Sequence, residues 1–481
     1  MPADTKSSGT GTIVARKRFA AADQRRFAAL SGDVNPLHLD PLAARRTPFG
    51  QPMVHGMHVV LWSLDALCAA GYVGMVGGLT AKFIRPCPVG DELVLVRTSV
   101  PPAEISAEVR VGDTVCVTLT LSRAAPSVPP AAGNEPLAPL RDPPSVPRLI
   151  DIADIAGRAG QFRLPDSRVS DAFPAAGARL GEPVLRGLAA LSAVIGMECP
   201  GRHSLFAAAM AAFTGQAGDT AHYRVLRVSA AVRQAVLRVQ AAGVDAVIRA
   251  GVLPPPAVQP RFATVGALVR PGEFGRARAL IVGGSRGLGE ATAKLIAAGG
   301  GRTVVTYARG RTDAAAVAGE IVAGGGRCEI AHLDVLDDAA AQVAMLPLQP
   351  TSLYYFATGP IAGHHDHAGA ARAAFERYYL QGFAELVRTL AAAAERRLIA
   401  FYPSTVFIAN PPPPFAAYAA AKAAGEALCT ELGQSLPNLR ILVRRLPRVA
   451  TDQTLSLMPL QTAGAIDIML PIVREIEALA G

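Results

Sequence analysis

Two side chains that can exchange protons lie close together near the start of the chain. Asp33 and His38 are separated by Val-Asn-Pro-Leu, which includes Asn35 and Pro36. We expect Pro36 to stiffen a loop in which the carboxylate and the imidazole face one substrate. Such a pair could bind one water and move its protons, as adding water to a thioester-conjugated double bond, or removing it, requires. An Asx turn beside a surface histidine is the alternative for this pattern alone.

A predicted helix start follows this pair. His55-Gly56 opens an apolar stretch that runs to Ala70, and N–H groups in the first turn of a helix have no partner within it. We expect the Gly56 N–H to polarise a thioester carbonyl.

A second set of reactive side chains lies in the last third of the chain. Tyr418-x-x-x-Lys422 on a helix puts both side chains on one face. A phenol with a pKa of roughly 10 is a poor acid at neutral pH, and a nearby ammonium eases its proton transfer. We expect Tyr418 to protonate a developing alkoxide, and Ser404, which follows a predicted strand, to hydrogen-bond the substrate carbonyl. A surface helix is the alternative for Tyr-x-x-x-Lys alone.

A glycine-rich loop precedes this set. Gly283, Gly287 and Gly289 lie between a strand predicted over 278–283 and a helix predicted over 290–298. Glycines at these positions let the backbone turn tightly and approach a pyrophosphate, and the N-terminus of a helix favours negative charge. The loop, the serine and the Tyr-Lys pair, in this order, predict a nucleotide-dependent reductase.

The elements that must position the reductase residues alternate along the chain. From residue 276 onward, β-rich runs alternate with alanine-rich helical runs, which predicts a doubly wound parallel sheet of the α/β class, a Rossmann-type fold. The predicted strands are 278–283, 303–307, 328–333, 352–357, 397–402 and 439–444.

The residues before 253 contain two copies of one pattern. His55-Gly56 and Arg186-Gly187 each open an apolar helical stretch, and Phe83 and Phe213 follow at nearly the same distance. One long helix followed by antiparallel strands is typical of a hotdog fold, so we predict an α+β double hotdog; two unrelated α+β units are the alternative. The predicted strands are 79–84, 92–98, 105–111, 114–122, 221–228, 232–241 and 245–252.

Two proline-rich stretches, 124–147 and 253–275, are predicted to be linkers. They divide the chain into a hotdog with the catalytic motif (1–123), a second hotdog that lacks it (148–252) and the reductase domain (276–481).

Composition limits the partners. Although 51% of the residues are apolar, no run reaches the roughly 18 residues of a membrane span and no signal peptide is visible, so we expect a cytoplasmic protein without membrane contact. The 6 cysteines have no metal-ligand spacing, and we expect no metal site. The net charge is +9, but the arginines are dispersed and only 5% of residues are aromatic. This balance argues against nucleic acid and favours a polyanionic ligand or an acidic carrier protein.

Residues 276–481 resemble the short-chain dehydrogenase/reductase family. The resemblance implies that Lys422 also holds a nicotinamide ribose and that the protein forms a homo-oligomer. Thr306-Tyr307-Ala308-Arg309 offers no carboxylate for a ribose 2′-hydroxyl, whereas Arg286 and Arg309 could bind a 2′-phosphate, so NADPH is favoured over NADH. The cofactor-binding residues expected are Gly283, Ser285, Arg286, Gly287, Leu288, Gly289, Arg309, Asp334, Ala357, Gly359, Lys422, Pro447 and Thr451. The chain departs from the family at Tyr379, where a catalytic asparagine is usual.

Residues 18–63 resemble the MaoC-type, R-specific enoyl-CoA hydratases and 3-hydroxyacyl dehydratases, and the likeness continues more loosely to Ser122. The resemblance implies catalytic roles for Asp33 and His38 and a supporting role for Asn35. The family often adds a helix serine, for which Ser63 is the candidate, one place short of the usual position, which is Leu64 here. The second repeat has no Asp-x-Asn-Pro-x-His motif before Gly187, so we expect it to be catalytically silent. His203, in the same repeat, is interpreted as a structural or substrate-tunnel residue.

Together these resemblances predict consecutive steps on one substrate. A 3-oxoacyl thioester of acyl carrier protein or CoA would be reduced and then dehydrated, as in fatty-acid or polyketide-type biosynthesis. The alternatives are the reverse pair of reactions in degradation, and a module that binds an acyl carrier without chemistry.

Overall fold

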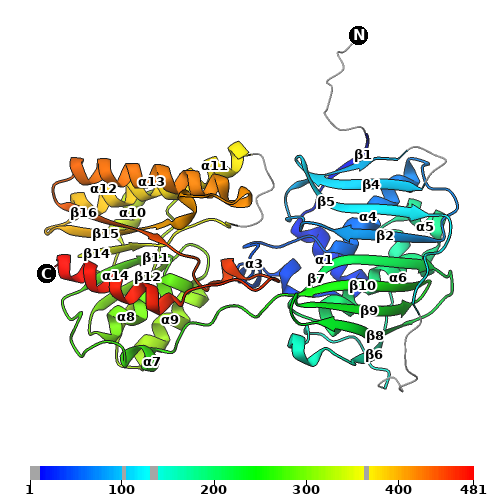
Figure 1. Cartoon of the computed structure of the whole chain (residues 1–481), viewed down its shortest axis with the longest axis horizontal. Helices are drawn as coiled ribbons and strands as arrows, with labels where there is room; N and C mark the ends of the chain where they lie inside the picture. Colours follow the sequence, from blue (N-terminus) through cyan, green and yellow to red (C-terminus); the bar gives the residue numbers. More distant parts are fainter. Residues whose placement is uncertain (1–10, 100–103, 130–138, 362–367, 481) are drawn as a thin grey trace, which may run out of the picture. The chain divides into compact units, whose positions relative to one another are not determined.

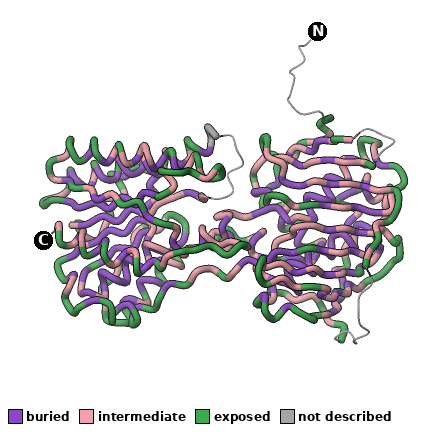
Figure 2. The backbone as a smooth tube through the Cα atoms, viewed as in Figure 1, coloured by how far each residue is buried: buried purple, intermediate pink, exposed green. Residues whose placement is uncertain are grey.

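The computed structural model describes residues 11–99, 104–129, 139–361 and 368–480. The chain divides into two compact units (Figure 1), one made mainly of residues up to Pro255 and one mainly of residues from Pro256 onward. Each unit is described by itself. In both, the residues of the central strands are mostly buried (Figure 2).

The N-terminal unit is built on a sheet of 10 strands in the order β1-β3-β4-β5-β2-β7-β10-β9-β8-β6. Its two halves have the same internal order, and they join where β2 and β7 pair antiparallel. The double hotdog is thereby confirmed. The strands are β1 (Thr12–Arg18), β2 (Gly78–Phe83), β3 (Glu92–Arg97), β4 (Ile105–Val111), β5 (Thr114–Ser122), β6 (Ala159–Arg163), β7 (Ser204–Phe213), β8 (Thr220–Ser229), β9 (Gln234–Ala241) and β10 (Val244–Val252).

Two apolar helices pack on one face of this sheet (Figure 1): α4 (Gly56–Ala69) and α6 (Glu182–Ala193), the latter continued by a π turn, η3 (Val194–Glu198). The second helix begins at Glu182, four residues before the predicted start at Arg186. Pro183 explains this, because its fixed φ and missing N–H suit the first turn of a helix. The shorter helices are α1 (Ala21–Ser31), α2 (Pro36–Leu39), α3 (Pro41–Ala44) and α5 (Pro174–Leu180).

Among the described residues, no single helix meets the length and hydropathy of a membrane span. One pair, Pro174–Leu180 with Glu182–Glu198, meets them jointly but is bent by 117°.

The C-terminal unit contains a parallel sheet of 6 strands in the order β13-β12-β11-β14-β15-β16. One apolar core lies against α8 and α14 and another against α12 and α13, so helices cover both faces, as predicted for a Rossmann-type fold. The strands are β11 (Arg278–Val282), β12 (Arg302–Tyr307), β13 (Arg327–His332), β14 (Ser352–Tyr355), β15 (Leu398–Thr405) and β16 (Leu439–Leu446). The helices are α7 (Phe262–Gly266), α8 (Gly287–Ala298), α9 (Arg311–Ala323), α10 (Ala339–Ala344), α11 (Ala368–Glu376), α12 (Phe383–Ala393), α13 (Ala416–Ser435) and α14 (Ala465–Ala480).

Neither predicted linker is simply an unpacked connection between domains. Within 253–275, Phe262, Val265 and Phe274 are buried in the core of the C-terminal unit, so this stretch packs as part of that unit. At the end of 124–147, Arg141 pairs with Phe162, and the adjoining Arg148 N–H donates to the Met197 carbonyl. Prolines exclude regular structure there, but they do not prevent packing.

A buried lysine fastens the 253–275 stretch to helices α8 and α9. The Lys294 ammonium, on α8, lies 2.8 Å from Glu290 and 2.9 Å from Glu320, and it donates to the Pro260 carbonyl at 3.0 Å. Glu320 also accepts from the Phe262 N–H at 2.7 Å.

We predict that Lys294→Met lowers the free energy of unfolding by about 1–3 kcal/mol, because two carboxylates lose their cation while keeping partial contact with water. Arg302→Gln, which breaks an exposed ion pair with Glu329 at 3.4 Å, should cost less than about 1 kcal/mol. Urea unfolding followed by circular dichroism measures both. Equal losses for the two variants would contradict this assignment.

Candidate active sites

Asp33 is a buried carboxylate held between the two hotdog repeats. It follows α1, which ends at Gly32 with a left-handed φ of 78°. One carboxylate oxygen accepts from the Ser192 hydroxyl at 2.7 Å and the other from the Asn35 N–H at 3.1 Å. A Cβ on Gly196 would lie 2.5 Å from this carboxylate, so only glycine allows the second repeat to approach so closely.

Ser192 is a site residue that the sequence analysis missed. It lies on α6 of the repeat that was expected to be catalytically silent, and through it this repeat supplies a direct hydrogen-bond partner to Asp33. A serine on the second apolar helix was the available signal, whereas the predicted candidate lay on the first. The candidate found there, Ser63, donates to the Val59 carbonyl one turn back at 2.8 Å and has a structural role.

Asn35 links the motif to the second repeat. Its side-chain oxygen accepts from the Leu37 N–H at 3.1 Å and caps α2. Its amide group donates to the carbonyls of Gly196 and Arg202 at 3.0 and 3.2 Å. The expected supporting role is therefore a set of specific hydrogen bonds. His203, next in sequence to Arg202, is half-buried, and its own carbonyl accepts from the Leu253 N–H at 2.8 Å.

His38 faces Asp33 from α2, a single helical turn where a loop was predicted. Its Nδ1 lies 2.8 Å from the Met53 carbonyl. Because a carbonyl only accepts, Nδ1 carries the proton and Nε2 keeps a lone pair. An imidazole nitrogen of His38 and a carboxylate oxygen of Asp33 lie within 4.8 Å of each other, a gap that one water could bridge by two hydrogen bonds.

The protein environment brings the proton affinities of this pair closer together. Burial raises the pKa of Asp33, although His38, Ser192 and Asn35 each act to lower it. Burial lowers the pKa of His38, against the attraction of Asp33 and the Met53 carbonyl. Opposite shifts of this kind suit two groups that pass protons between them.

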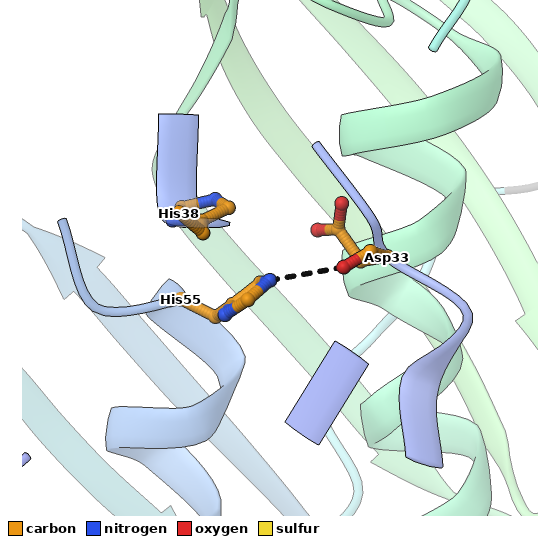
Figure 3. A group of neighbouring side chains, drawn as sticks. All are labelled: Asp33, His38 and His55. Atoms are coloured by element: carbon orange, nitrogen blue, oxygen red, sulfur yellow. Dashed lines mark hydrogen bonds between the residues drawn. The ribbon is translucent and has the colours of Figure 1, made fainter. Parts of the chain in front are cut away.

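His55 and Gly56 complete this site. The His55 ring stacks on His38, and its Nε2 lies 3.1 Å from the Asp33 backbone carbonyl (Figure 3). Its Nδ1 lies 2.8 Å from the Gln24 side-chain oxygen. Gly56 is the first residue of α4, and a Cβ there would lie 2.9 Å from the Phe83 ring. Both His55 nitrogens face oxygen atoms, those of Gln24 and Asp33, so the group of Asp33, His38 and His55 offers fewer free ligand atoms than a zinc site requires.

The glycine loop of the C-terminal unit has the geometry of a phosphate cradle. Gly283 and Gly287 have left-handed φ values of 74° and 57°, and α8 begins at Gly287. A Cβ on Gly289 would lie 2.5 Å from the Gly283 carbonyl oxygen. Ser285 is buried in the loop, and Leu288 packs against the core. Glycine is therefore required for the strand-to-helix turn that can receive a pyrophosphate.

The two arginines expected at a 2′-phosphate differ. Arg286 is paired with Asp452 at 3.0 Å, so its expected role requires this ion pair to open. Arg309 is exposed just after β12 and makes no ion pair with the residues that the structure describes. Thr451, beside Asp452, lies near the glycine loop, because a Cβ on Gly287 would be 3.4 Å from its methyl carbon.

The remaining cofactor candidates follow β13, β14 and β16. Asp334 accepts from the Leu336 N–H at 3.1 Å in an Asx turn. A Cβ on Gly359 would lie 3.1 Å from the Tyr378 ring, Ala357 packs against the core, and Pro447 is exposed. These residues follow strand ends at the carboxyl edge of the sheet, where α/β folds bind nucleotides.

Ser404 does not reach Tyr418. It is buried in β15 and donates to Glu426 at 2.5 Å, and Glu426 also binds Arg445. Successive side chains of a strand point to opposite faces, and the hydrogen-bond partner of Tyr418 is the next residue, Thr405. This corrects the prediction of Ser404.

Tyr418 keeps its proton more firmly than expected. Burial raises its pKa to about 12, and the hydrogen bond with Thr405 only partly opposes this shift. Lys422, 4% exposed, donates to the Pro403 carbonyl at 2.7 Å, and burial lowers its pKa to about 7. The expected easing of Tyr418 ionisation by Lys422 is thus absent from this arrangement.

Tyr379 fills the space beside these residues. It lies in a π turn, η4 (Arg377–Gly382), is 1% exposed, and its ring covers the Lys422 ammonium at 3.8 Å. Its hydroxyl makes a short contact with Thr358, and its ring meets Tyr418 edge-on at 5.8 Å. A tyrosine at this position therefore encloses the lysine in aromatic rings.

Comparison with known proteins agrees with the two units. The family model "MaoC like domain" matches residues 6–122, and "short chain dehydrogenase" matches residues 277–348. The first unit is 42% identical over 88 residues to the (R)-specific enoyl-CoA hydratase of Aeromonas caviae, covering 16% of this chain and 59% of that protein. It is 35% identical over 77 residues to the mitochondrial 3-hydroxyacyl-[acyl-carrier-protein] dehydratase of Arabidopsis thaliana, covering 16% and 46%. The chain thus spans less than two thirds of either relative.

Solved structures similar to this chain include FolM alternative dihydrofolate reductase 1 of Brucella suis in complex with NADP, at 20% identity and a TM-score of 0.36, covering 42% of this chain and 88% of that one. Another is a 3-oxoacyl-[acyl-carrier protein] reductase of Brucella melitensis with bound NAD, at 19% identity and a TM-score of 0.37, covering 44% and 88%. With the family matches, the sheet orders and the residues of the two sites, the chain carries a MaoC-like dehydratase domain followed by a short-chain dehydrogenase domain.

Proposed function

We propose that this protein is a bifunctional, NADPH-dependent ketoreductase and dehydratase that acts on 3-oxoacyl and 3-hydroxyacyl thioesters in fatty-acid or polyketide-type biosynthesis. The observation that carries the proposal is the Asp33 and His38 pair, which faces a gap of at most 4.8 Å and is completed by Ser192. The product of ketone reduction is the substrate of this dehydration, so the two domains fit one sequence of reactions.

In the dehydratase half, Asp33 and His38 share the proton transfers. In the hydration direction, one group takes a proton from the water as its oxygen bonds to the β-carbon and the double bond opens, and the pair delivers a proton to the α-carbon; dehydration reverses these steps. The Gly56 N–H, at the first position of α4, would polarise the thioester carbonyl as negative charge develops on it.

In the reductase half, NADPH supplies a hydride when bound. The cradle of Gly283, Gly287 and Gly289 would hold its pyrophosphate, and Arg309 would meet its 2′-phosphate. Tyr418 is protonated at neutral pH, because its pKa is about 12, and would protonate the alkoxide that forms. Thr405 would orient the substrate carbonyl.

The substrate would be presented as an acyl carrier protein or CoA thioester. The name of one relative refers to enoyl-CoA and that of the other to an acyl carrier protein. Both kinds of thioester carry negative charge, which a chain of net charge +9 would attract.

A second candidate function rests on Tyr379. Its ring covers Lys422 and its hydroxyl is held by Thr358, an arrangement that would hinder contact between Lys422 and a cofactor ribose. In that case the C-terminal domain would bind nucleotide or acyl carrier without reducing its substrate.

The central test mixes the full-length protein with a 3-oxoacyl thioester and NADPH and follows NADPH absorbance and acyl products by mass spectrometry. We expect NADPH consumption and an enoyl product. Asp33→Asn should stop at the 3-hydroxyacyl thioester, since the buried pair loses its carboxylate. Enoyl formation at the normal rate by Asp33→Asn would remove the dehydratase assignment, and cofactor binding without NADPH consumption would favour the second candidate function.

The reductase site predicts different outcomes for two adjacent hydroxyl residues. Thr405→Val should lower the rate of ketone reduction by about 10- to 100-fold, because the hydrogen-bond partner of Tyr418 is lost. Ser404→Ala should retain more activity than Thr405→Val, since its hydroxyl serves Glu426. Steady-state NADPH oxidation measures both variants, and the reverse order of rates would restore the role first predicted for Ser404.

Ser192 and Ser63 are both buried serines on helices, but only Ser192 donates to Asp33, so Ser63 can serve as its control. Ser192→Ala should slow hydration of an enoyl-CoA by about 10-fold or more, because removing a hydrogen bond to a buried carboxylate costs roughly 1.5–3 kcal/mol. Ser63→Ala removes only a bond to its own helix and should stay within about 2-fold of the parent rate. Loss of enoyl absorbance gives both rates; indistinguishable rates would separate Ser192 from the chemistry.

A further inference from the structure

We propose that His55 is the positioning residue of the dehydratase site, because the face of its ring orients His38 and the edge of its ring fixes Asp33. The proposal rests on the proposed dehydratase function and extends it to a residue that the sequence analysis used only to mark a helix start. His55 has no exposed surface; it contacts His38 and Asp33 and directly precedes Gly56.

The face of the His55 ring lies against His38. The two ring centroids are 3.8 Å apart, and the planes are inclined by 27° (Figure 3). The Met53 carbonyl holds Nδ1 of His38 at 2.8 Å but leaves the ring free to turn about that bond. The stack removes this freedom, so Nε2 stays directed at the gap opposite Asp33.

The edge of the His55 ring fixes the backbone of Asp33. Nε2 lies 3.1 Å from the Asp33 carbonyl oxygen, and on the other edge Nδ1 lies 2.8 Å from the Gln24 side-chain oxygen. The same oxygen accepts the His55 N–H at 3.0 Å. Gln24, which is fully buried, therefore holds the backbone of His55, and the single ring proton of neutral His55, placed on Nε2, is donated to the Asp33 carbonyl.

His55 also links this pair to Gly56. It is the residue that caps α4, and its carbonyl accepts the N–H groups of His58 and Val59 at 3.0 and 3.2 Å. A rotation of His55 would move the first turn of α4 and the Gly56 N–H with it. His38, Asp33 and the Gly56 N–H must all meet one substrate, and contacts of one residue, His55, thus set the positions of all three.

The charge of His55 suits a positioning role. Burial and the neighbouring His38 hold its pKa well below the usual range, so it stays neutral. The charged or titratable groups that face His38 are Asp33, His55 and, more distantly, His58, whose pKa burial lowers to about 3. When His38 gains a proton, it therefore meets one carboxylate and neutral rings, whose π faces attract a cation.

His55 is not itself a proton donor to substrate in this arrangement. Both of its nitrogens are directed at fixed oxygens of Gln24 and Asp33, and the gap is bounded by His38 and the Asp33 carboxylate. Its contribution therefore acts through the groups that it holds.

Two substitutions separate the face of the ring from its edge. His55→Phe keeps an aromatic face but loses both nitrogens, whereas His55→Gln keeps a donor group but loses the stack. His58→Phe is the matched control, because His58 lies on the same helix, is buried, and stacks on Phe27 at 4.6 Å. Reductase activity and circular dichroism of each full-length variant report whether the chain is folded.

We expect both His55 variants to lower kcat for enoyl-CoA hydration by about 10- to 100-fold with little change in KM, because displacements near 1 Å have effects of this size. His58→Phe should remain within about 3-fold. Equal losses in His55→Phe and His58→Phe, or losses confined to KM, would overturn the proposal.

Nitrogen-15 NMR of the histidine rings tests the geometry without turnover. The parent protein should show His38 with its proton on Nδ1, and His55→Gln should titrate His38 at a lower pH, because the cation has lost its π partner. If the parent protein does not hydrate enoyl-CoA, the proposed function fails, yet the NMR result still decides the positioning role. An unchanged His38 tautomer and titration in both His55 variants would refute it.

Discussion

The dehydratase half depends on a carboxylate that is shielded from bulk water. Burying an ionised group is costly unless hydrogen bonds and neighbouring charge compensate. Asp33 meets this requirement with the Ser192 hydroxyl, the Asn35 N–H and the attraction of His38. Each partner in turn requires other structure, namely α6 for Ser192 and the π turn for the carbonyl that holds Asn35. The second hotdog therefore extends the sheet and also supplies hydrogen bonds that offset the cost of burying the Asp33 carboxylate.

The reductase half also buries an ionisable group, but here it is the cation of Lys422. Lys422 is as buried as Asp33, but it has one carbonyl acceptor and aromatic rings in place of an anion. Burial consequently lowers its pKa to about 7, and the ammonium is lost as the pH rises through neutrality. Tyr418, with a pKa of about 12, keeps its proton over the same range. This half therefore holds a reliable proton donor beside a lysine whose charge is only partly present.

The sequence predicted elements well where local pattern and tertiary contact agree. The six strands of the parallel sheet, the strands after Phe83 and the positive-φ glycines Gly283 and Gly287 follow from patterns of a few residues. β7 was missed because Ser-Leu-Phe-Ala-Ala-Ala-Met-Ala-Ala-Phe has the composition of a helix, and pairing with β2 and β10 overrides that preference. Ser404 was predicted and Thr405 was missed because spacing along the chain does not reveal which face of β15 a side chain occupies. The ion pair of Arg286 with Asp452 joins residues too distant in sequence for any local pattern to show.

The MaoC-like family match ends before the second repeat, which contributes the residues that make the burial of Asp33 possible. The MaoC-like match covers residues 6–122, which include Asp33, Asn35, His38, His55 and Gly56 but not Ser192 or Gly196. A first repeat by itself would expose Asp33 on the side where the second repeat now approaches, and the Asn35 amide would lose both carbonyl partners. Water would then solvate the carboxylate and return its pKa toward the ordinary value, removing the shift that brings it closer to His38. The repeat that lacks the motif thus creates the environment in which the motif can work, and the two repeats form one site.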